Sequence, residues 1–483
     1  MESRQQRWGI ARAAAIPGLL VLAAGGLLAE DAGLLHTTGD LRGALRVAGN
    51  LPVYDANPEH PWNRLFTALY TRPSHLPARP DGPPVARREG GDVLEFLAWG
   101  RTTYWSSPEV VEKLVQLLDR FLDGREERLI RDPLHRVWLQ QDLWAAHDYL
   151  VTQNLFQFGD RPAARRRQRL AGLLAKAIRA LALPRAELEK LPDNYAAALR
   201  SGAFVPEHDW DRTRSYLPPA LLADPEQWLE VDFHQPNLHE DIEGRFITLH
   251  TRHFRGRSYF RVFYRYPGGR TALDEYLQYV DREGLDWKFG AQNGFLRLKP
   301  GLRQIPAGTE VALLQFLIAL DEQLQPVPTR MVQSVRLRTF KNADGAPDPM
   351  TDSGKGMNVY EYVLRRRLCF DGLRHGGLER EPNDLPQYRL VFQGPKAPDW
   401  GPRGRQETVG SQCVSCHTGQ GPGTYSLVTL TNQGGFDAGA MLGVAHVLLP
   451  GKPSPRGPRA VRWKLRDETY RRLVENAETE EAG

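Results

Sequence analysis

The sequence predicts an α+β protein of several units: a mainly helical amino-terminal unit, a β-rich middle unit and a carboxyl-terminal region of helices and loops. Apolar residues repeat at helical spacing in the first part of the chain and alternate with polar residues in the middle. The 483 residues also exceed what one hydrophobic core usually serves. We expect a leader at residues 1–29 and units at residues 30–205, 206–345 and 346–483.

Composition and charge place the chain among folded, loop-rich proteins. Hydrophobic residues make up 41% and charged residues 25%, which is ordinary globular usage, while 36 prolines and 45 glycines indicate many turns. The net charge of +5 is small for this length, and basic residues are scattered among nearly as many acids. Nucleic-acid binding relies on a strong positive field, so we expect no nucleic-acid partner. The densest basic run, residues 161–169, is interpreted as a solvated helix face.

The first residues have the layout of an export signal. Arg4, Arg7 and Arg12 precede an apolar run without charge at residues 13–29. A secretory signal peptide and an uncleaved membrane anchor share this pattern, and both remain open because no clean cleavage site follows. We therefore expect a periplasmic or otherwise exported protein, with attachment to the inner membrane through residues 13–29 as an alternative. No later stretch is long and apolar enough to span a bilayer.

Start and stop signals outline the helical unit. Ser107 caps a helix that begins at Pro108, and apolar residues repeat at helical spacing as far as Gly124. Further helices are expected at about 133–149 and 170–181. Asp193 then caps a short helix.

The β-rich unit contains four expected strands and one helix. Residues 246–253 and 259–266 alternate bulky and polar side chains around a turn, which is typical of a hairpin. Thr271 caps a helix that runs to Val280. Two more strands are expected at 311–319 and 332–340, joined by a connection at 321–328.

One short motif carries chemistry. Cys413 and Cys416 are separated by two residues, and His417 follows at once. This is the spacing of c-type haem attachment, in which each thiol bonds to one vinyl group and the histidine binds the iron. A thioredoxin-like pair would need a βαβ context, whereas a glycine-rich run at 418–423 follows here. Zinc would need four ligands, and the remaining cysteine, Cys369, is alone and far upstream.

Residues 413–423 resemble the haem-attachment segment of c-type cytochromes, where a glycine-rich loop often follows the histidine. The resemblance implies one covalent haem c, with Cys413 and Cys416 forming the thioether bonds and His417 as an axial iron ligand. Residues 396–412 are rich in proline and glycine, where small cytochromes have an amphipathic helix. The haem segment is therefore expected to be held by the preceding domain.

The sixth iron ligand decides what such a haem can do. Methionine or histidine there closes the iron for electron transfer, while an open site admits small ligands. Met441 is the leading candidate because it lies downstream of the motif among small and apolar residues, and His446 is the second. Met350 and Met357 also remain open.

Basic and imidazole side chains elsewhere raise two further hypotheses. One of Arg365, Arg366 and Arg367 could pair with a haem propionate, although a solvated helix face is the simpler interpretation. Cys369 lies in an apolar run and is expected to be a buried small residue. Four histidines close in sequence could bind a metal, but we interpret them as independent surface residues: His234, His239, His250 and His253.

The sequence thus favours an exported single-haem c-type cytochrome-like protein that passes single electrons to a redox partner protein. The alternative is a haem oxidoreductase or small-ligand sensor with an exchangeable sixth site, either peroxidase-like or gas-binding. A third hypothesis is a binding protein in which the haem segment is subordinate. Whether the chain is an enzyme stays open at this point.

Overall fold

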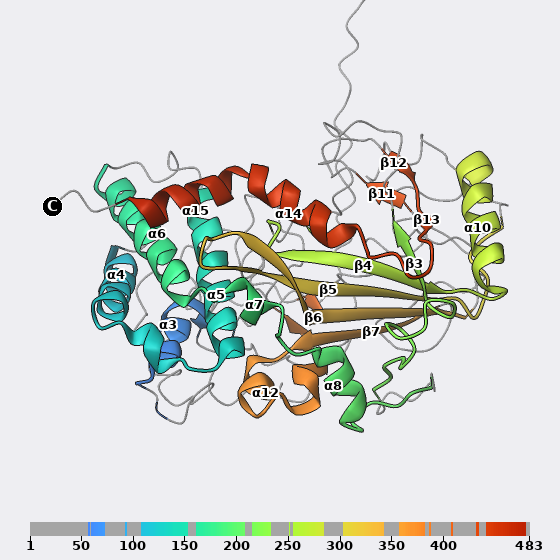
Figure 1. The fold of residues 1–483 in the computed structure, drawn as a ribbon, viewed down its shortest axis with the longest axis horizontal. Helices are drawn as coiled ribbons and strands as arrows, with labels where there is room; N and C mark the ends of the chain where they lie inside the picture. The colour runs from blue at the N-terminus through green and yellow to red at the C-terminus, as the bar shows by residue number, and fades with distance from the viewer. Residues whose placement is uncertain are drawn as a thin grey trace, which may run out of the picture.

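The protein is a mixed α+β structure in which helices pack against an antiparallel seven-stranded sheet (Figure 1). The computed structural model describes residues 57, 59–72, 92–93, 108–152, 161–207, 215–232, 251, 255–284, 303–341, 357–381, 386–387, 407–408, 431–433 and 441–479. The coarse prediction of an α+β protein is confirmed for these residues. The leader at 1–29 lies outside them.

Helices make up most of the described residues up to position 200. The longer ones are α3 (Pro61–Tyr70), α4 (Pro108–Asp123), α5 (Pro133–Thr152) and α6 (Arg161–Leu181), followed by the short α7 (Arg185–Leu188) and α8 (Asn194–Arg200). Asp193 caps α8, because its carboxylate accepts a hydrogen bond from the backbone N–H of Ala196 at 2.9 Å. The predictions for α4, α5 and α8 are confirmed to within a few residues, and α6 begins at Arg161, where the basic run at 161–169 was interpreted as a helix face.

The helix α10 (Gly269–Tyr279) begins two residues before the predicted start at Thr271. Gly268 is its N-cap, with a φ of 85° that L side chains rarely adopt. A Cβ atom at that position would also lie 2.8 Å from the Cβ of Ala272. The prediction that Thr271 caps this helix was wrong, because glycine can make the tighter turn that Thr271 cannot.

The strands of the main sheet lie in the order β13-β3-β4-β5-β6-β7-β8, and every neighbouring pair is antiparallel. Their bounds are β3 Leu229–Asp232, β4 Ser258–Arg265, β5 Glu310–Leu320, β6 Pro326–Phe340, β7 Met357–Leu364, β8 Leu378–Glu381 and β13 His446–Val447. The predicted strands at 259–266, 311–319 and 332–340 are confirmed as β4, β5 and β6.

The predicted hairpin strand at 246–253 lies outside the described residues, except for Thr251. One detail of the predicted sheet was wrong. The connection between β5 and β6 is shorter than expected, because the Asp321 carboxylate accepts hydrogen bonds from the backbone N–H groups of Gln323 and Gln325 and closes a tight turn.

The sheet extends beyond the expected boundary at residue 345. β7 and β8 continue it on one side, and β13 forms its opposite edge. Short two-stranded sheets lie outside it; the one that precedes β13 pairs β11 (Thr431–Gln433) with β12 (Met441–Val444). The chain between β8 and β13 therefore leaves one edge of the main sheet and returns at the other.

One face of the sheet and the helices share the larger hydrophobic core. Phe263, Ala312, Leu337 and Tyr360 lie side by side across four strands and belong to the same cluster as Trp144 of α5. A smaller hydrophobic cluster lies on the opposite face of the sheet. There α10 packs against strand residues that alternate with the four named above, such as Val262, Val311 and Val359.

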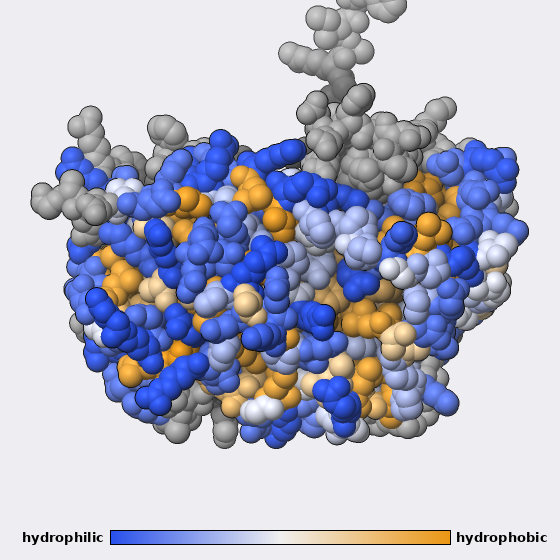
Figure 2. Space-filling view, in the orientation of Figure 1, coloured by the Kyte–Doolittle hydropathy of each residue, from blue (hydrophilic) through white to orange (hydrophobic). Residues whose placement is uncertain are grey.

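Two carboxyl-terminal helices join the sheet to the helical layer. α14 (Arg456–Arg466) packs on β4 and β6, and α15 (Glu468–Glu478) packs on α5 and α6, as the red helices in Figure 1 show. Figure 2 shows a largely hydrophilic surface over the described residues on this face, with small scattered apolar patches.

Candidate functional site

The predicted haem-attachment residues, Cys413, Cys416 and His417, lie outside the described residues. Met350 and the four histidines at 234, 239, 250 and 253 do as well. The two leading candidates for the sixth iron ligand are placed. Met441 is the first residue of β12 and its backbone is paired with Gln433, whereas nothing is described of its side chain.

His446 is the first residue of β13, where it pairs with Asp232 of β3. Ala445 alone separates β12 from β13, so the two candidate ligands lie close together in the chain but in different sheets. His446 is solvent-exposed. Its pKa is lowered from the usual 6.5, first by partial burial of the ring and then by Arg456 and Arg459, against the effect of Asp232. The neutral form of this imidazole, which is the form that binds metals, is therefore favoured.

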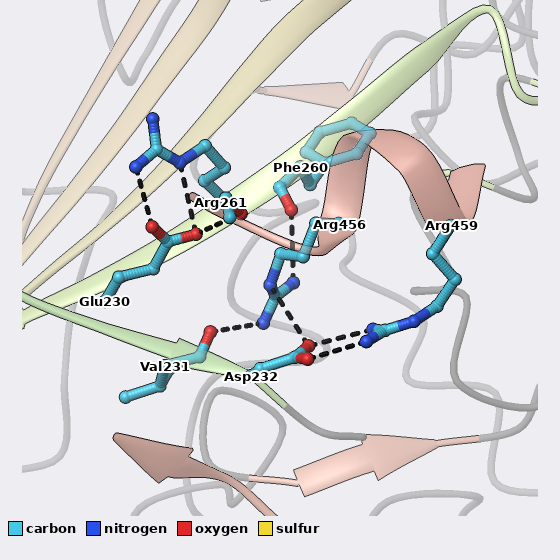
Figure 3. A network of polar contacts seen from close by, with 8 residues as sticks. Glu230, Val231, Asp232, Phe260, Arg261, Arg456 and Arg459 are labelled. Atoms are coloured by element: carbon cyan, nitrogen blue, oxygen red, sulfur yellow. Dashed lines mark hydrogen bonds and ion pairs between the residues drawn. The ribbon is translucent and has the colours of Figure 1, made fainter. Parts of the chain in front are cut away.

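On β3, the strand next to β13, the carboxylate of Asp232 contacts two arginines, Arg456 and Arg459 (Figure 3). Asp232 accepts hydrogen bonds from Arg459 at 2.9 and 2.7 Å, in a two-pronged pair, and lies 3.5 Å from Nε of Arg456. Arg456 also donates to the backbone oxygens of Val231 and Phe260 at 2.7 and 3.1 Å. These contacts attach the first turns of α14 to β3 and β4.

A second carboxylate extends this network along β3. Glu230 accepts hydrogen bonds from Arg261 of β4 at 2.6 and 3.1 Å and from the hydroxyl of Ser454 at 2.5 Å. Asp232, Arg456 and Arg459 are each at most 4% exposed. Removing one member would leave a buried charge without its partner. The network therefore fixes the edge of the sheet next to Met441 and His446, the two candidate iron ligands.

A separate buried cluster lies where α14 and α15 meet α5. Asp148 is fully buried and binds Arg257 at 2.8 Å and Lys464 at 3.3 Å. Burial alone would raise the pKa of the Asp148 carboxyl, but Lys464 and Arg257 hold it below its usual value. His147, the preceding residue, is also fully buried and lies 3.2 Å from the amide of Asn476 in α15.

The interpretation of the arginine run at 365–367 as a solvated helix face was wrong for its first two members. Arg365 pairs with Glu379 at 2.7 Å, and Arg366 makes a two-pronged pair with Asp142 of α5. Both arginines are at most 8% exposed. The hypothesis that one arginine of this run pairs with a haem propionate stays a prediction. Nothing is described of the side chain of Arg367.

Cys369 is a buried cysteine, 3% exposed, as expected for a small residue of the core. Among the residues that the structure describes, no group of three or more histidine, cysteine, aspartate or glutamate side chains could hold a metal ion. A haem held by residues 413–417 would lie outside this set. None of the described helices is long and apolar enough to cross a membrane.

No protein-family model, curated protein or solved structure matches this chain.

Sequence reasoning missed the buried polar residues at the carboxyl end. The chain from Arg456 onward is polar in sequence, yet Arg456, Arg459 and Lys464 are buried on the face of α14 that meets the sheet and α5. One local signal was available. Asp467 caps α15 by accepting a hydrogen bond from the backbone N–H of Thr469 at 2.8 Å, and an aspartate at such a position predicts a helix start.

Proposed function

We propose that this chain is an exported, single-haem c-type cytochrome-like protein that exchanges single electrons with a redox partner protein. The observation that carries the proposal is the spacing of Cys413, Cys416 and His417. The side chains fit a haem. Two thiols separated by two residues could bond to the two vinyl groups of one porphyrin, and the adjacent imidazole would hold its iron. The leader at 1–29 supports it, because c-type haem is attached outside the cytoplasm.

Each residue of the motif has a distinct role in the proposal. Cys413 and Cys416 would hold the ring through thioether bonds, and the imidazole of His417 would hold the iron. Met441, or His446 in second place, would be the further iron ligand. The bound group would supply reversible one-electron exchange at its iron.

The fold supports this assignment at one point. The chain after the motif continues into β12 and β13, and β13 pairs with β3. Asp232 of β3 binds Arg459 of α14, and Glu230 binds Ser454 just before that helix. A buried, hydrogen-bonded network is rigid, and ligands on rigid elements keep their geometry when the charge of the iron changes. We propose that residues 346–483, which also contribute β7, β8 and β13 to the main sheet, are the haem-bearing region.

The test is covalent haem attachment. The full chain is produced in a host that attaches c-type haem, and the denatured protein is examined for haem that stays bound and for the matching increase in mass. Cys413→Ala and Cys416→Ala should each retain haem through at most one bond and lose most of the holoprotein. Cys369→Ala is the matched control, because it removes the buried cysteine outside the motif and should keep both bonds.

An unmodified mass for the wild-type chain in that host would overturn the proposal. Carbon monoxide separates the two classes of haem protein. A reduced spectrum that does not respond to carbon monoxide supports electron transfer, while a clear shift supports the haem enzyme or sensor instead.

A further inference from the structure

The imidazole of His147 is buried between α5 and α15, and it has a single hydrogen bond to the described residues. His147 lies on α5 and is 0% exposed, and its Nε2 is 3.2 Å from Nδ2 of Asn476 on α15. Its Nδ1 is also buried and has no hydrogen-bond partner among the described residues. Whichever way the Asn476 amide is turned, the neutral ring satisfies one nitrogen and leaves the other without a partner.

The charges around this ring are mostly positive. Asp148 is adjacent on α5, but it already binds Lys464 of α14 and Arg257. Arg472 of α15 also acts on the ring, while it pairs with Glu468 and donates to the backbone oxygen of Val151. A proton on His147 would therefore add a positive charge beside three cations and two carboxylates, and both carboxylates already pair with those cations.

Protonation would also disturb the contact with α15. An imidazolium has two N–H donors and no acceptor. Turning the Asn476 amide would let its oxygen accept one of them, but the second N–H would remain unsatisfied and the charge would remain buried. Moving α15 away from α5 exposes the unsatisfied N–H and the charged ring to water, and this removes the free-energy cost of burying them.

We propose that α15 is an acid-released helix, whose packing against α5 opens when His147 binds a proton. The pKa of His147 is lowered from 6.5 to about 4, mainly by burial and further by Lys464 and Arg472, against the opposing effect of Asp148. The docked state thus excludes the proton and the open state accepts it. The docked state is at full stability above about pH 6.5, loses stability as the pH falls, and stops losing it near pH 4.

The release is confined to α15 by the way α14 is attached. Arg456 and Arg459 fix the start of α14 to Asp232, far along the chain from His147. Asp467 alone separates the two helices, with an extended ψ of 133°. A rotation at this residue moves α15 once the hydrogen bonds from Lys464 to Thr469 and from Tyr470 to the oxygen of Leu324 break. Opening exposes the apolar side of α15 that includes Tyr470 and Leu473, together with the surface of α5 and α6 beneath it.

The experiment measures hydrogen exchange of the full chain between pH 7.5 and pH 4.5, corrected for the intrinsic effect of pH. Peptides from residues 467–479 report on α15, and peptides from residues 170–181 of α6 are the internal reference. Protection of α15 should fall on the order of tenfold or more between pH 7 and pH 5, since each pH unit in this window is worth up to a factor of about ten. Protection of α6 should change much less.

Two variants make the assignment specific. His147→Gln keeps a neutral hydrogen-bonding side chain and should make the protection of α15 independent of pH in this window. Asn476→Asp places a carboxylate beside the ring and should keep α15 protected at pH 5, with the imidazolium paired. His135→Gln, on the same helix but stacked on Phe370 at its other end, is the matched control and should behave as the wild type.

The inference is overturned if the protection of α15 does not fall with pH in the wild type, or if it falls equally in His147→Gln. It is overturned as well if Asn476→Asp releases α15 at pH 5 like the wild type. Since the measurement follows a helix and not the haem, none of these outcomes depends on the function proposed above.

Discussion

Asn194 of α8 supplies the hydrogen bonds that a neighbouring strand would otherwise make with Val332 of β6. Its Oδ1 accepts from the backbone N–H of Val332 at 2.7 Å, and its Nδ2 donates to the Val332 oxygen at 2.9 Å. The last pair between β6 and β7 is Ser334 with Val363, so Val332 lies beyond the reach of β7. The side-chain amide thus satisfies buried backbone groups where the sheet ends. Nδ2 also donates to the oxygen of Gly376 at 2.9 Å.

Asn194→Ala should lower the free energy of unfolding by about 3 to 5 kcal/mol, because it removes buried hydrogen bonds and leaves backbone groups of Val332 unsatisfied. Urea unfolding of the full chain measures it. Asp193→Ala is the matched control at the adjacent residue, where loss of an exposed helix cap should cost about 1 kcal/mol. Equal costs for the two variants would show that the contacts of Asn194 with β6 contribute nothing beyond the helix.

Asp232→Asn should destabilise the protein by about 3 to 5 kcal/mol, because two buried arginines would lose their carboxylate. A double-mutant cycle with Arg459→Met isolates the pair: the double variant should be less destabilised than the sum of the two single variants. The exposed pair of Arg185 and Glu189, whose side chains are 59% and 58% exposed, is the control and should show a coupling below about 1 kcal/mol. An additive cycle at Asp232 would contradict the role given to this network.

The sequence predicts those features whose signals lie among neighbouring residues. Asp193 and the residues it caps are neighbours, and the apolar and β-branched residues of β5 and β6 lie in short consecutive runs, so both were predictable. Gly268 was missed as a cap because Thr271 offers a stronger side-chain signal nearby, and only the backbone geometry separates the two.

Long-range polar pairs gave no such signal. Lys464 and Asp148 are 316 positions apart, and Arg366 and Asp142 are 224 apart. An arginine or lysine in a polar run predicts a solvated surface unless its partner is known. The haem motif differs, because its chemistry lies within five consecutive residues, and the sequence carries that prediction without help from the fold.

Glu310→Gln should cost more stability at acid pH than at neutral pH. The carboxyl group of Glu310 is 2% exposed, and burial raises its pKa above 4.5 despite the opposing effects of Arg265 at 2.9 Å and the Tyr216 hydroxyl at 3.2 Å. A raised pKa in the folded state means that the stability it contributes is present below pH 4.5 and is lost as the pH rises through the folded value. Unfolding in urea between pH 4 and pH 7 measures the difference between variant and wild type.

Tyr216→Phe provides the companion measurement for this carboxyl group. The hydroxyl of Tyr216 donates to Glu310 and favours its ionised form, so its loss should raise the pKa of Glu310 further and extend the pH-dependent range upward. A wild type and a Glu310→Gln variant that differ by the same amount at every pH would contradict both expectations.

If the chain carries haem c as proposed, Met441→Ala should change the sixth iron ligand and His446→Ala should not. Methionine ligation gives a weak charge-transfer band in the oxidised spectrum, and loss of that band with new carbon monoxide binding is the expected result for Met441→Ala. His446 is the matched control because it lies on the next strand, five positions on, and its backbone stays paired with Asp232 in either variant. If His446→Ala changed the sixth ligand and Met441→Ala did not, the sixth ligand would be His446, on the edge strand β13 of the main sheet. In that case the charges of Asp232, Arg456 and Arg459, which already act on His446, would act on the ligand itself, and Arg459→Met should then shift the reduction potential.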